Sequence, residues 1–356
     1  MNTGTVIKAA SQFIGEGSNI SIAPIGNGLI NHTYKVENNI DKNAVVLQAL
    51  NTNVFKKPED IASNYKELYQ FLQSHANGSR IPAPIIASNG ELIWKDADEN
   101  NWRATEFIHD SFSPTIAADE KAAFTVAKSF ASFTKSLAQL DIHLLKEIIP
   151  NFHNLSFRYY QFEEAIKNAS QDRLLKSTHI IAELRQRKKL VDFFELTQNS
   201  KEYPTRVMHH DCKITNILFD KNTGKVICPV DLDTVMPGKF FSDLGDMIRS
   251  MACTVDENSI AWEEIDIRTD FYKAIINGYL EGIGNIFTEE EKKNIHYSGL
   301  ILIYMQALRF IADNLNNDVY YKITYPEQNL SRSMNQLLLL EKLEAFLVKE
   351  YAFSAY

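Results

Sequence analysis

The sequence changes character once, near residue 110, and this change is the strongest constraint on its fold. Before it, short runs rich in β-branched and aromatic residues are separated by turns of Gly, Asn and Asp, which is typical of antiparallel strands. After it, apolar residues recur at helical spacing, with one interruption over residues 205–238. We therefore predict an α+β protein with two lobes, a small β-rich lobe over residues 1–110 and a larger, mainly helical lobe over residues 111–356.

The first lobe is expected to hold a five-stranded antiparallel sheet with a helix laid on it. The helix should begin at Pro58, because acids fill the first turn after this proline and apolar residues follow at helical spacing. A second, short amphipathic helix is predicted over residues 4–14. The five predicted strands are ISIAPIG, LINHTYKVE, AVVLQAL, GELIWKD and NWRATEFIHD.

Length and charge narrow the function to small-molecule chemistry. At 356 residues the chain exceeds the size at which one core keeps growing, so a cleft between two lobes is the expected place for a site. The formal net charge of −8 argues against a nucleic-acid partner. The amino-terminal residues lack the basic and apolar segments of a secretory signal, and the strongest apolar stretch, residues 300–311, is too short to cross a bilayer. We expect a cytoplasmic protein with reduced cysteines and no membrane contact; its oligomeric state is left open.

The block that interrupts the helical half carries the candidate chemistry. A short apolar strand over residues 206–208 leads to the loop HHD, and two further strands flank the turn DKNTG to form a hairpin. This arrangement places Asp211 and Asn216 before one strand and Asp231 at the end of the other. We therefore expect the three side chains to converge on one point.

Phosphoryl transfer needs such a convergence, because its catalyst positions a hydroxyl and neutralises charge on the transferred group. Asp211 is predicted to be the base that accepts the proton of the attacking hydroxyl. Asp231 and the amide oxygen of Asn216 are predicted to hold Mg²⁺, a hard cation that prefers oxygen ligands. Asp233 is left open between a metal or substrate contact and structural hydrogen bonding. His209 is expected to brace the loop.

The spacing H-x-D-x₄-N, followed about fifteen residues later by [IV]-D-x-D, resembles the catalytic loop and metal strand of the aminoglycoside phosphotransferase and choline kinase superfamily. These proteins are relatives of the protein kinases, so the resemblance implies a protein-kinase-like, two-lobed fold. It also implies an enzyme that uses ATP and Mg²⁺. The glycines Gly26 and Gly28 would then allow close backbone approach to the nucleotide phosphates. The backbone around Glu106 to Ile108 would bind the adenine between the lobes.

One position departs from this family pattern. In related kinases the strand after the glycine-rich turn ends in a lysine that binds phosphate, whereas the strand AVVLQAL presents Gln48. Glutamine cannot supply a fixed positive charge. Either Mg²⁺ and other cations compensate, or the chain is a pseudokinase that binds nucleotide without turnover.

Longer strings, among them GNGLINHTY, VDLDTVMPGKFFSDLGDMIR and LRFIADNLNNDVYYKITYPEQN, resemble the N-acetylhexosamine 1-kinase group of this superfamily. The resemblance implies phosphorylation of the anomeric hydroxyl of N-acetylglucosamine or N-acetylgalactosamine, with Arg309 as a sugar or phosphate contact and Tyr320 as a sugar-stacking partner. Members of that group also carry Gln at the position of Gln48, which weakens the pseudokinase alternative. From the residues alone, Arg309 could equally be an arginine that extends from an apolar helix face to water.

Another acceptor remains the main alternative within the superfamily: an aminoglycoside, choline, homoserine or methylthioribose. A cationic acceptor would require an acidic pocket. Acids for such a pocket are present in the sequence at Glu263, Glu264, Asp266 and Asp270.

Overall fold

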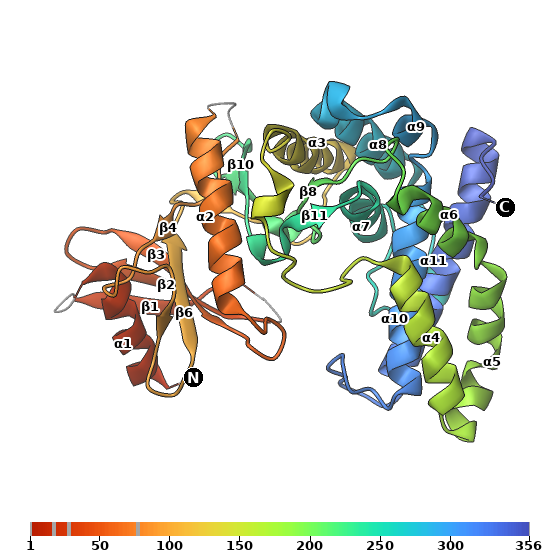
Figure 1. Cartoon of the computed structure of the whole chain (residues 1–356), viewed down its shortest axis with the longest axis horizontal. Helices are drawn as coiled ribbons and strands as arrows, with labels where there is room; N and C mark the ends of the chain where they lie inside the picture. Colours follow the sequence, from red (N-terminus) through yellow and green to blue (C-terminus); the bar gives the residue numbers. More distant parts are fainter. Residues whose placement is uncertain (1, 16–18, 27–29, 76–78, 356) are drawn as a thin grey trace. The chain divides into compact units, whose positions relative to one another are not determined.

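The computed structural model describes residues 2–15, 19–26, 30–75 and 79–355, and its chain forms two compact units (Figure 1). The first unit comprises residues 1–112, 139–150 and 218–236; the second comprises residues 113–138, 151–217 and 237–356. The predicted α+β class is confirmed, with the large sheet in the first unit and the long helices in the second. The chain first leaves the first unit at residue 112 and returns to it twice.

The large sheet of the first unit is antiparallel and has the order β1-β2-β3-β6-β4, with β5 paired to β6. It contains six described strands where the sequence predicted five. The missed strand has only two residues and lies among prolines, which donate no ladder hydrogen bond, so no strand pattern marks it. The strands are β1 (Ile20–Pro24), β2 (His32–Asn38), β3 (Ala44–Leu50), β4 (Pro84–Ile85), β5 (Trp94–Lys95) and β6 (Asn101–Glu106).

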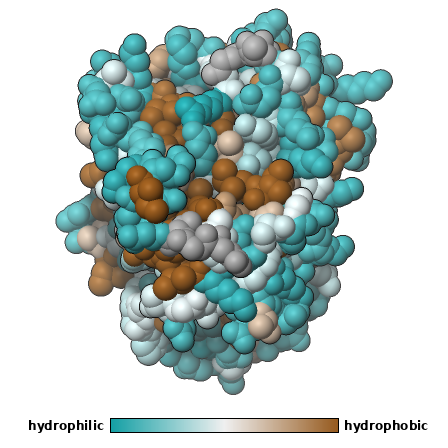
Figure 2. All heavy atoms as spheres, turned by 90° about the vertical axis from the view of Figure 1, so that its left-hand side faces the viewer, coloured by the Kyte–Doolittle hydropathy of each residue, from teal (hydrophilic) through white to brown (hydrophobic). Residues whose placement is uncertain are grey.

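The core of this sheet is completed by α1 (Thr3–Ile14). Its buried residues recur at helical spacing, and the small pair Ala9 and Ala10 joins a cluster with Leu47 and Trp102 of the sheet. Trp102 is fully buried, and its indole N–H donates to Asp96 Oδ2 at 2.8 Å, so its polar atom is satisfied. The outer surface is mixed: hydrophobic residues are scattered among hydrophilic ones on the face shown in Figure 2.

Helix α2 (Pro58–Ser74) begins at the predicted proline and joins the returning segments to the first unit. Its buried Asn64 donates to the carbonyls of Lys146 at 2.9 Å and Val235 at 3.1 Å, and accepts from Lys146 N at 2.7 Å. A single buried amide therefore links residues 139–150 and 218–236 to this helix. The second returning segment carries the predicted hairpin of β9 (Ile217–Asp220) and β10 (Val226–Pro229), which extends through β9 to β7 (Ser111–Phe112).

In the second unit, two close helix contacts depend on glycine. In α8 (Thr269–Ile283), a Cβ at Gly278 would lie 2.3 Å from the carbonyl oxygen of Phe124 in α3 (Glu120–Ser136). In α7 (Phe241–Met251), a Cβ at Gly245 would lie 2.3 Å from the carbonyl oxygen of Ser298 in α10 (Tyr297–Leu315). Side chains at these positions would push the helices apart, so both glycines set the backbone spacing around α7 and α8.

Within the half predicted to be helical, residues 155–198 form three separate helices. The first break occurs where Ser170 begins a new helix by accepting a hydrogen bond from Arg173 N. The three are α4 (Leu155–Asn168), α5 (Gln171–Gln186) and α6 (Lys189–Gln198); the remaining helices are α9 (Glu289–Lys293) and α11 (Gln328–Tyr351). Among the described residues, no helix is both long enough and apolar enough to cross a membrane.

Candidate active site

The loop that follows β8 (Arg206–Met208) is held through its backbone. The carboxylate of Asp243, in the first turn of α7, accepts hydrogen bonds from His209 N at 3.0 Å and His210 N at 2.8 Å. Asp243 is 1% exposed, so both bonds are shielded from water. His210 has a φ of 66°, a left-handed conformation that non-glycine residues rarely adopt. The two hydrogen bonds fix this conformation and aim the next residue, Asp211.

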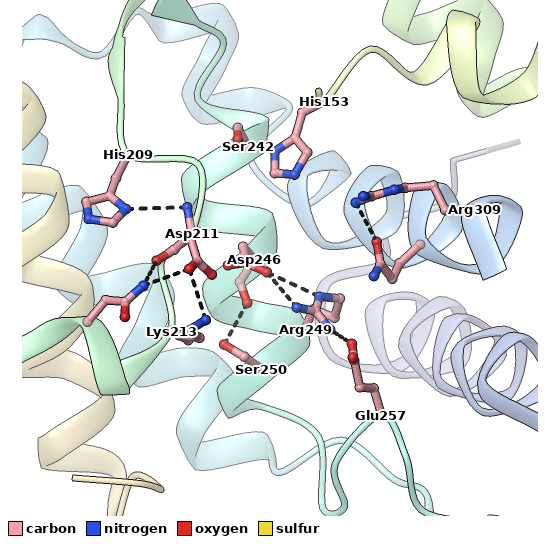
Figure 3. Close-up of polar contacts among 12 residues, drawn as sticks. His153, His209, Asp211, Lys213, Ser242, Asp246, Arg249, Ser250, Glu257 and Arg309 are labelled. Atoms are coloured by element: carbon pink, nitrogen blue, oxygen red, sulfur yellow. Dashed lines mark hydrogen bonds and ion pairs between the residues drawn. The ribbon is translucent and has the colours of Figure 1, made fainter. Parts of the chain in front are cut away.

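The histidines of this loop have structural contacts. His209 is buried with its ring 4.9 Å from that of Phe130, which fits the predicted bracing role. The Nδ1 of His210 lies 2.6 Å from Ser242 Oγ, and His153 contacts the same hydroxyl (Figure 3). Burial lowers the pKa of His153 well below its ordinary value, and the nearby His210 lowers it further. His153 is therefore neutral at neutral pH.

Asp211 and Asn216 are brought together, as predicted. Asn216 Nδ2 donates to the carbonyl oxygen of Asp211 at 2.9 Å and to Asp211 Oδ2 at 2.8 Å. Lys213 Nζ forms an ion pair with the same Oδ2 at 2.9 Å (Figure 3). The Asp211 side chain is 29% exposed, so it is reachable from solvent while two neighbours fix its position. Because the Asn216 amide nitrogen is used by Asp211, its amide oxygen is left for another partner.

A second carboxylate, Asp246, lies near Asp211 and was not singled out as functional by the sequence. Burial raises the pKa of Asp246, and the charge of Asp211 raises it further, while Arg249 lowers it. Arg249 pairs with Asp246 at 2.8 Å and with Glu257 at 2.6 Å, and Glu257 also pairs with Arg332 of α11 at 2.7 Å (Figure 3). These ion pairs connect α7 to α11 behind the loop.

In the first unit, the turn that follows β10 is held through a side chain. Asp231 has a φ of 60° and precedes a short 3₁₀ turn. Two residues later, the buried Asp233 pairs with Arg103 Nη2 at 2.5 Å through Oδ1 and accepts from Asn31 Nδ2 at 2.8 Å through Oδ2. Oδ1 thus has an ion-pair partner, although the contact lacks hydrogen-bond geometry, and Oδ2 has a hydrogen-bond partner. These contacts favour the structural hydrogen bonding that the sequence left open; a substrate or metal contact stays a prediction.

Gln48 is part of the same cluster. Gln48 on β3 lies directly opposite Arg103 on β6. Its Oε1 accepts from Arg103 Nε at 3.0 Å and Nη2 at 2.7 Å, and its Nε2 donates to Thr33 Oγ1 at 3.1 Å. The sequence did not single out Arg103, because the register between the strands NWRATE and AVVLQAL is not specified by their local patterns.

Four other residues were predicted to bind the nucleotide, and three of them, Gly26, Glu106 and Ile108, lie in the described part of the chain. Gly26 has a φ of 73°, which suits glycine, whereas Gly28 lies outside the described residues. Glu106 N donates to Ala83 O at 2.8 Å, and the carbonyl of Ile108 accepts from Ser111 Oγ at 2.6 Å. These contacts of the first unit already engage one backbone group of Glu106 and one of Ile108, and their predicted adenine contacts stay predictions.

In the second unit, Arg309 of α10 lies among aromatic rings. Its guanidinium is 5.5 Å from the ring centroids of Phe152 and Tyr321, and Nη1 donates to Gln306 Oε1 at 3.1 Å. The predicted stacking residue Tyr320 is 63% exposed and contacts Tyr321 edge-on. The tyrosine ring near Arg309 is the half-buried one of Tyr321. The stacking role of Tyr320 stays a prediction.

Arg158 of α4 adds a second cation to this region. It donates to the Phe152 carbonyl at 3.0 Å and to Gln161 Oε1 at 2.8 Å, while its buried Nε has no hydrogen-bond partner among the described residues. Burial lowers the pKa of Arg158 to about 10, and the charge of Arg309 contributes to this shift. Within the described part of the chain, neither Arg158 nor Arg309 forms an ion pair. The region is therefore cationic and contains aromatic rings.

Three solved structures share this fold at low sequence identity. A microcompartment-associated aminopropanol kinase matches with a TM-score of 0.63 and 14% identity, over 98% of each chain. An aminoglycoside phosphotransferase from Alicyclobacillus acidocaldarius matches with a TM-score of 0.59 and 13% identity, over 96% of this chain and 93% of the other. A choline kinase from Cryptosporidium parvum matches with a TM-score of 0.58 and 16% identity, over 98% of this chain and 97% of the other.

The α+β fold is kinase-like, as the sequence predicted. A model of the phosphotransferase enzyme family, which includes the aminoglycoside phosphotransferases, matches residues 21–283. The chain belongs to this family. Its acceptor, its metal and the roles of its individual residues are matters of proposal.

Proposed function

We propose that the chain transfers the γ-phosphoryl group of ATP to the anomeric hydroxyl of an N-acetylhexosamine, giving the sugar 1-phosphate and ADP. The observation that carries the choice of acceptor is the cationic, aromatic region around Arg309 and Arg158, in the same unit as Asp211. Use of a nucleotide is supported by solved relatives, which include a spectinomycin phosphotransferase with ADP and spectinomycin and an aminoglycoside 2′-phosphotransferase with GDP.

Asp211 acts as the base in this proposal. Its contacts with Asn216 and Lys213 go to Oδ2, so Oδ1 is available to accept the proton of the sugar hydroxyl. The hydroxyl oxygen then bonds to the γ-phosphorus as the bond to the ADP oxygen breaks. Proton transfer of this kind contributes about 10²–10⁴-fold to the rate. Positioning and charge neutralisation supply the remainder.

The donors proposed for Mg²⁺ fit its chemistry. The amide oxygen of Asn216 and the carboxylate of Asp231 are hard oxygen ligands, and Mg²⁺ usually uses one or two carboxylates together with waters and substrate phosphates. Across the described residues, no cluster of three or more His, Cys, Asp or Glu side chains forms a metal site, and the proposed ion does not need one. When bound, it would neutralise negative charge on the nucleotide phosphates.

The choice of an amino sugar over a cationic acceptor follows from charge. A choline or an aminoglycoside placed beside Arg309 and Arg158 would meet like charge, and both arginines are half-buried, where repulsion is screened less than at the surface. The acids that kept a cationic acceptor open, at residues 263, 264, 266 and 270, are all exposed on the surface. A neutral sugar has hydroxyl and carbonyl oxygens that accept hydrogen bonds from arginine, and its ring can stack on aromatic side chains.

An acceptor screen with ATP and Mg²⁺ tests the proposal. N-acetylglucosamine, N-acetylgalactosamine, choline, homoserine, methylthioribose and an aminoglycoside are compared, and the anomeric phosphate is identified by NMR. We expect transfer to one or both amino sugars. Transfer to choline or an aminoglycoside but to neither amino sugar rejects the acceptor; nucleotide binding without transfer to any acceptor favours the pseudokinase alternative.

A substitution then connects the activity to the cationic region. Arg309→Met should raise the KM for the amino sugar about 10- to 100-fold, because a charge-assisted hydrogen bond to the acceptor is lost. Arg185→Met is the matched control, since this arginine forms only an exposed pair with Glu163 in the same unit. Equal KM values in the two variants would show that Arg309 does not contact the acceptor.

A further inference from the structure

Arg103 is a buried cation in the sheet of the first unit. It projects from β6, directly opposite Gln48 on β3, and is 7% exposed. Gln48 occupies the position where related kinases carry a phosphate-binding lysine. In the cluster of Arg103, Gln48 and Asp233, the positive charge therefore lies on β6 instead of at position 48 on β3.

The contacts of Gln48 explain why it is a glutamine. Its carbonyl oxygen receives two N–H groups of Arg103, and its amide nitrogen is used by Thr33, so the side chain is fixed in one orientation. A lysine at position 48 would face the Arg103 guanidinium across the strand pair, and like charges directly opposite each other are unfavourable. Gln48 thus fixes the position of the Arg103 guanidinium by accepting two of its hydrogen bonds.

The guanidinium retains one unused donor. Nε and Nη2 are used by Gln48, and Nη2 also pairs with Asp233, but the buried Nη1 has no hydrogen-bond partner among the described residues. A buried charged donor without a partner is costly unless a ligand supplies one. A guanidinium can serve a carboxylate and a phosphate at the same time, because it has five N–H groups in a planar fork.

We propose that Arg103 is the phosphate-binding cation of this protein, taking the role of the absent lysine, and that Gln48 is its positioning residue. Asp233 balances the guanidinium and leaves Nη1 for a nucleotide phosphate oxygen. The inference rests on the proposed use of ATP, and it is independent of the acceptor. It also accounts for an active enzyme without a lysine at position 48.

Nucleotide affinity, measured on the full chain by calorimetry without Mg²⁺, tests the proposal. Because Arg103 should contact phosphate and not the base, Arg103→Met should lower ATP affinity about 10- to 100-fold and leave adenosine affinity unchanged. Arg103→Lys keeps the charge and should lose less. Unchanged ATP affinity in Arg103→Met would overturn the proposal, as would an equal loss for ATP and adenosine.

A double variant separates phosphate binding from a structural role. If Arg103 only neutralises Asp233, the variant Arg103→Met with Asp233→Asn should recover wild-type ATP affinity, because no buried charge is left unpaired. We expect the loss to persist. Full recovery would assign Arg103 to structure alone and overturn the proposal.

Moving the charge back to β3 gives the complementary test. Gln48→Lys with Arg103→Gln places the cation on the other strand, and it should recover at least half of the logarithmic loss in ATP affinity seen for Arg103→Met. Gln48→Lys alone should bring no gain, because two cations then face each other. If the double variant binds ATP no more tightly than Arg103→Met does, phosphate binding does not depend on the position of this positive charge, and the proposal is overturned.

These outcomes are separable from failure of the proposed function. A wild-type chain that binds neither ATP nor GTP overturns both proposals. ATP binding that depends on Arg103, without transfer to any amino sugar, overturns only the acceptor.

Discussion

Two turns carry the predicted chemistry, and they are held in different ways. The loop of residues 209–216 is fixed through its backbone, because the buried Asp243 accepts two of its N–H groups. The turn of residues 231–234 is fixed through a side chain, because Asp233 is paired with Arg103 and Asn31. In the loop, the acid that holds the structure is remote in sequence from the proposed base. In the turn, the holding acid is two residues from the proposed metal ligand.

Both turns contain a residue in the left-handed region, His210 with φ of 66° and Asp231 with φ of 60°. Such conformations cost of order 1–3 kcal/mol and persist only where the surroundings enforce them. The two modes of support should therefore respond differently to substitution. Removing the base should affect activity and leave stability unchanged, whereas removing a holding group should affect stability first.

The largest effect is expected for Asp211→Asn. We expect kcat to fall about 10²–10⁴-fold, because the base is lost, with ATP affinity and the unfolding midpoint within error of wild type. The side chain is 29% exposed, and the introduced asparagine keeps an oxygen that can accept the hydrogen bond from the buried Asn216, so the fold should stay intact. Steady-state kinetics and chemical denaturation measure both quantities, with the exposed Asp270→Asn as a control. An unchanged rate would end the assignment of Asp211 as base.

The second prediction concerns the stability of the turn. Arg103→Met should destabilise the protein by about 3–5 kcal/mol, because it leaves the buried carboxylate of Asp233 unpaired. Asp233→Asn should cost a comparable amount, and the double variant less than either single variant. Urea denaturation provides the comparison, with Arg80→Met at an exposed pair as a control within about 0.5 kcal/mol. Additive losses in the double variant would contradict a coupled buried pair.

The contrast between the turns also separates what the sequence predicts from what it does not. Asp211 and Asn216 lie five residues apart in one loop, so their hydrogen bonds follow from local spacing. The pairing of Gln48 with Arg103 joins residues fifty-five positions apart, across a segment that contains α2 and two short strands. Its register is set by the fold of the whole sheet, which local patterns do not specify.

The same distinction applies within the second unit. Asp246 and Arg249 lie three residues apart on α7, so their ion pair follows from the local spacing of one helix. Its extension through Glu257 to Arg332 joins α7 to α11, and that contact depends on helix packing. The helical spacing after residue 110 likewise predicted helices but not the break between α4 and α5, because the N-cap Ser170 is a single polar residue within a repeating apolar pattern.

A third prediction tests the backbone support of the loop. Asp243→Asn should destabilise the protein by about 2–3 kcal/mol, because an amide offers only one acceptor oxygen for the N–H groups of His209 and His210. The rate should also fall, since the loop that aims Asp211 is loosened, and the KM for ATP should change little. Denaturation and kinetics on the same preparation measure both. A loss of rate without any loss of stability would contradict the bracing role.

The smallest effect is expected for the change in protein stability when the pH is lowered. Burial depresses the pKa of His153, which contacts Ser242 beside the loop, so the folded protein excludes a proton that the unfolded chain binds below about pH 6.5. The contribution of neutral His153 to the free energy of unfolding should therefore be fully present above this pH. It should decrease as the pH drops from about 6.5 toward 5. The positive charges of Arg309 and Arg158 also lower the pKa of His153.

His153→Gln removes this titration and should make the fall in melting temperature with acid shallower, by the equivalent of up to one proton. His179→Gln, at an exposed position of α5, is the matched control. The side chains that hold Asp233 are an arginine and an asparagine rather than a histidine, so the turn of residues 231–234 should be less sensitive to acid than the loop. Hydrogen exchange at pH 5 compares the two regions directly: greater protection loss in the turn than in the loop would contradict the assigned difference in support.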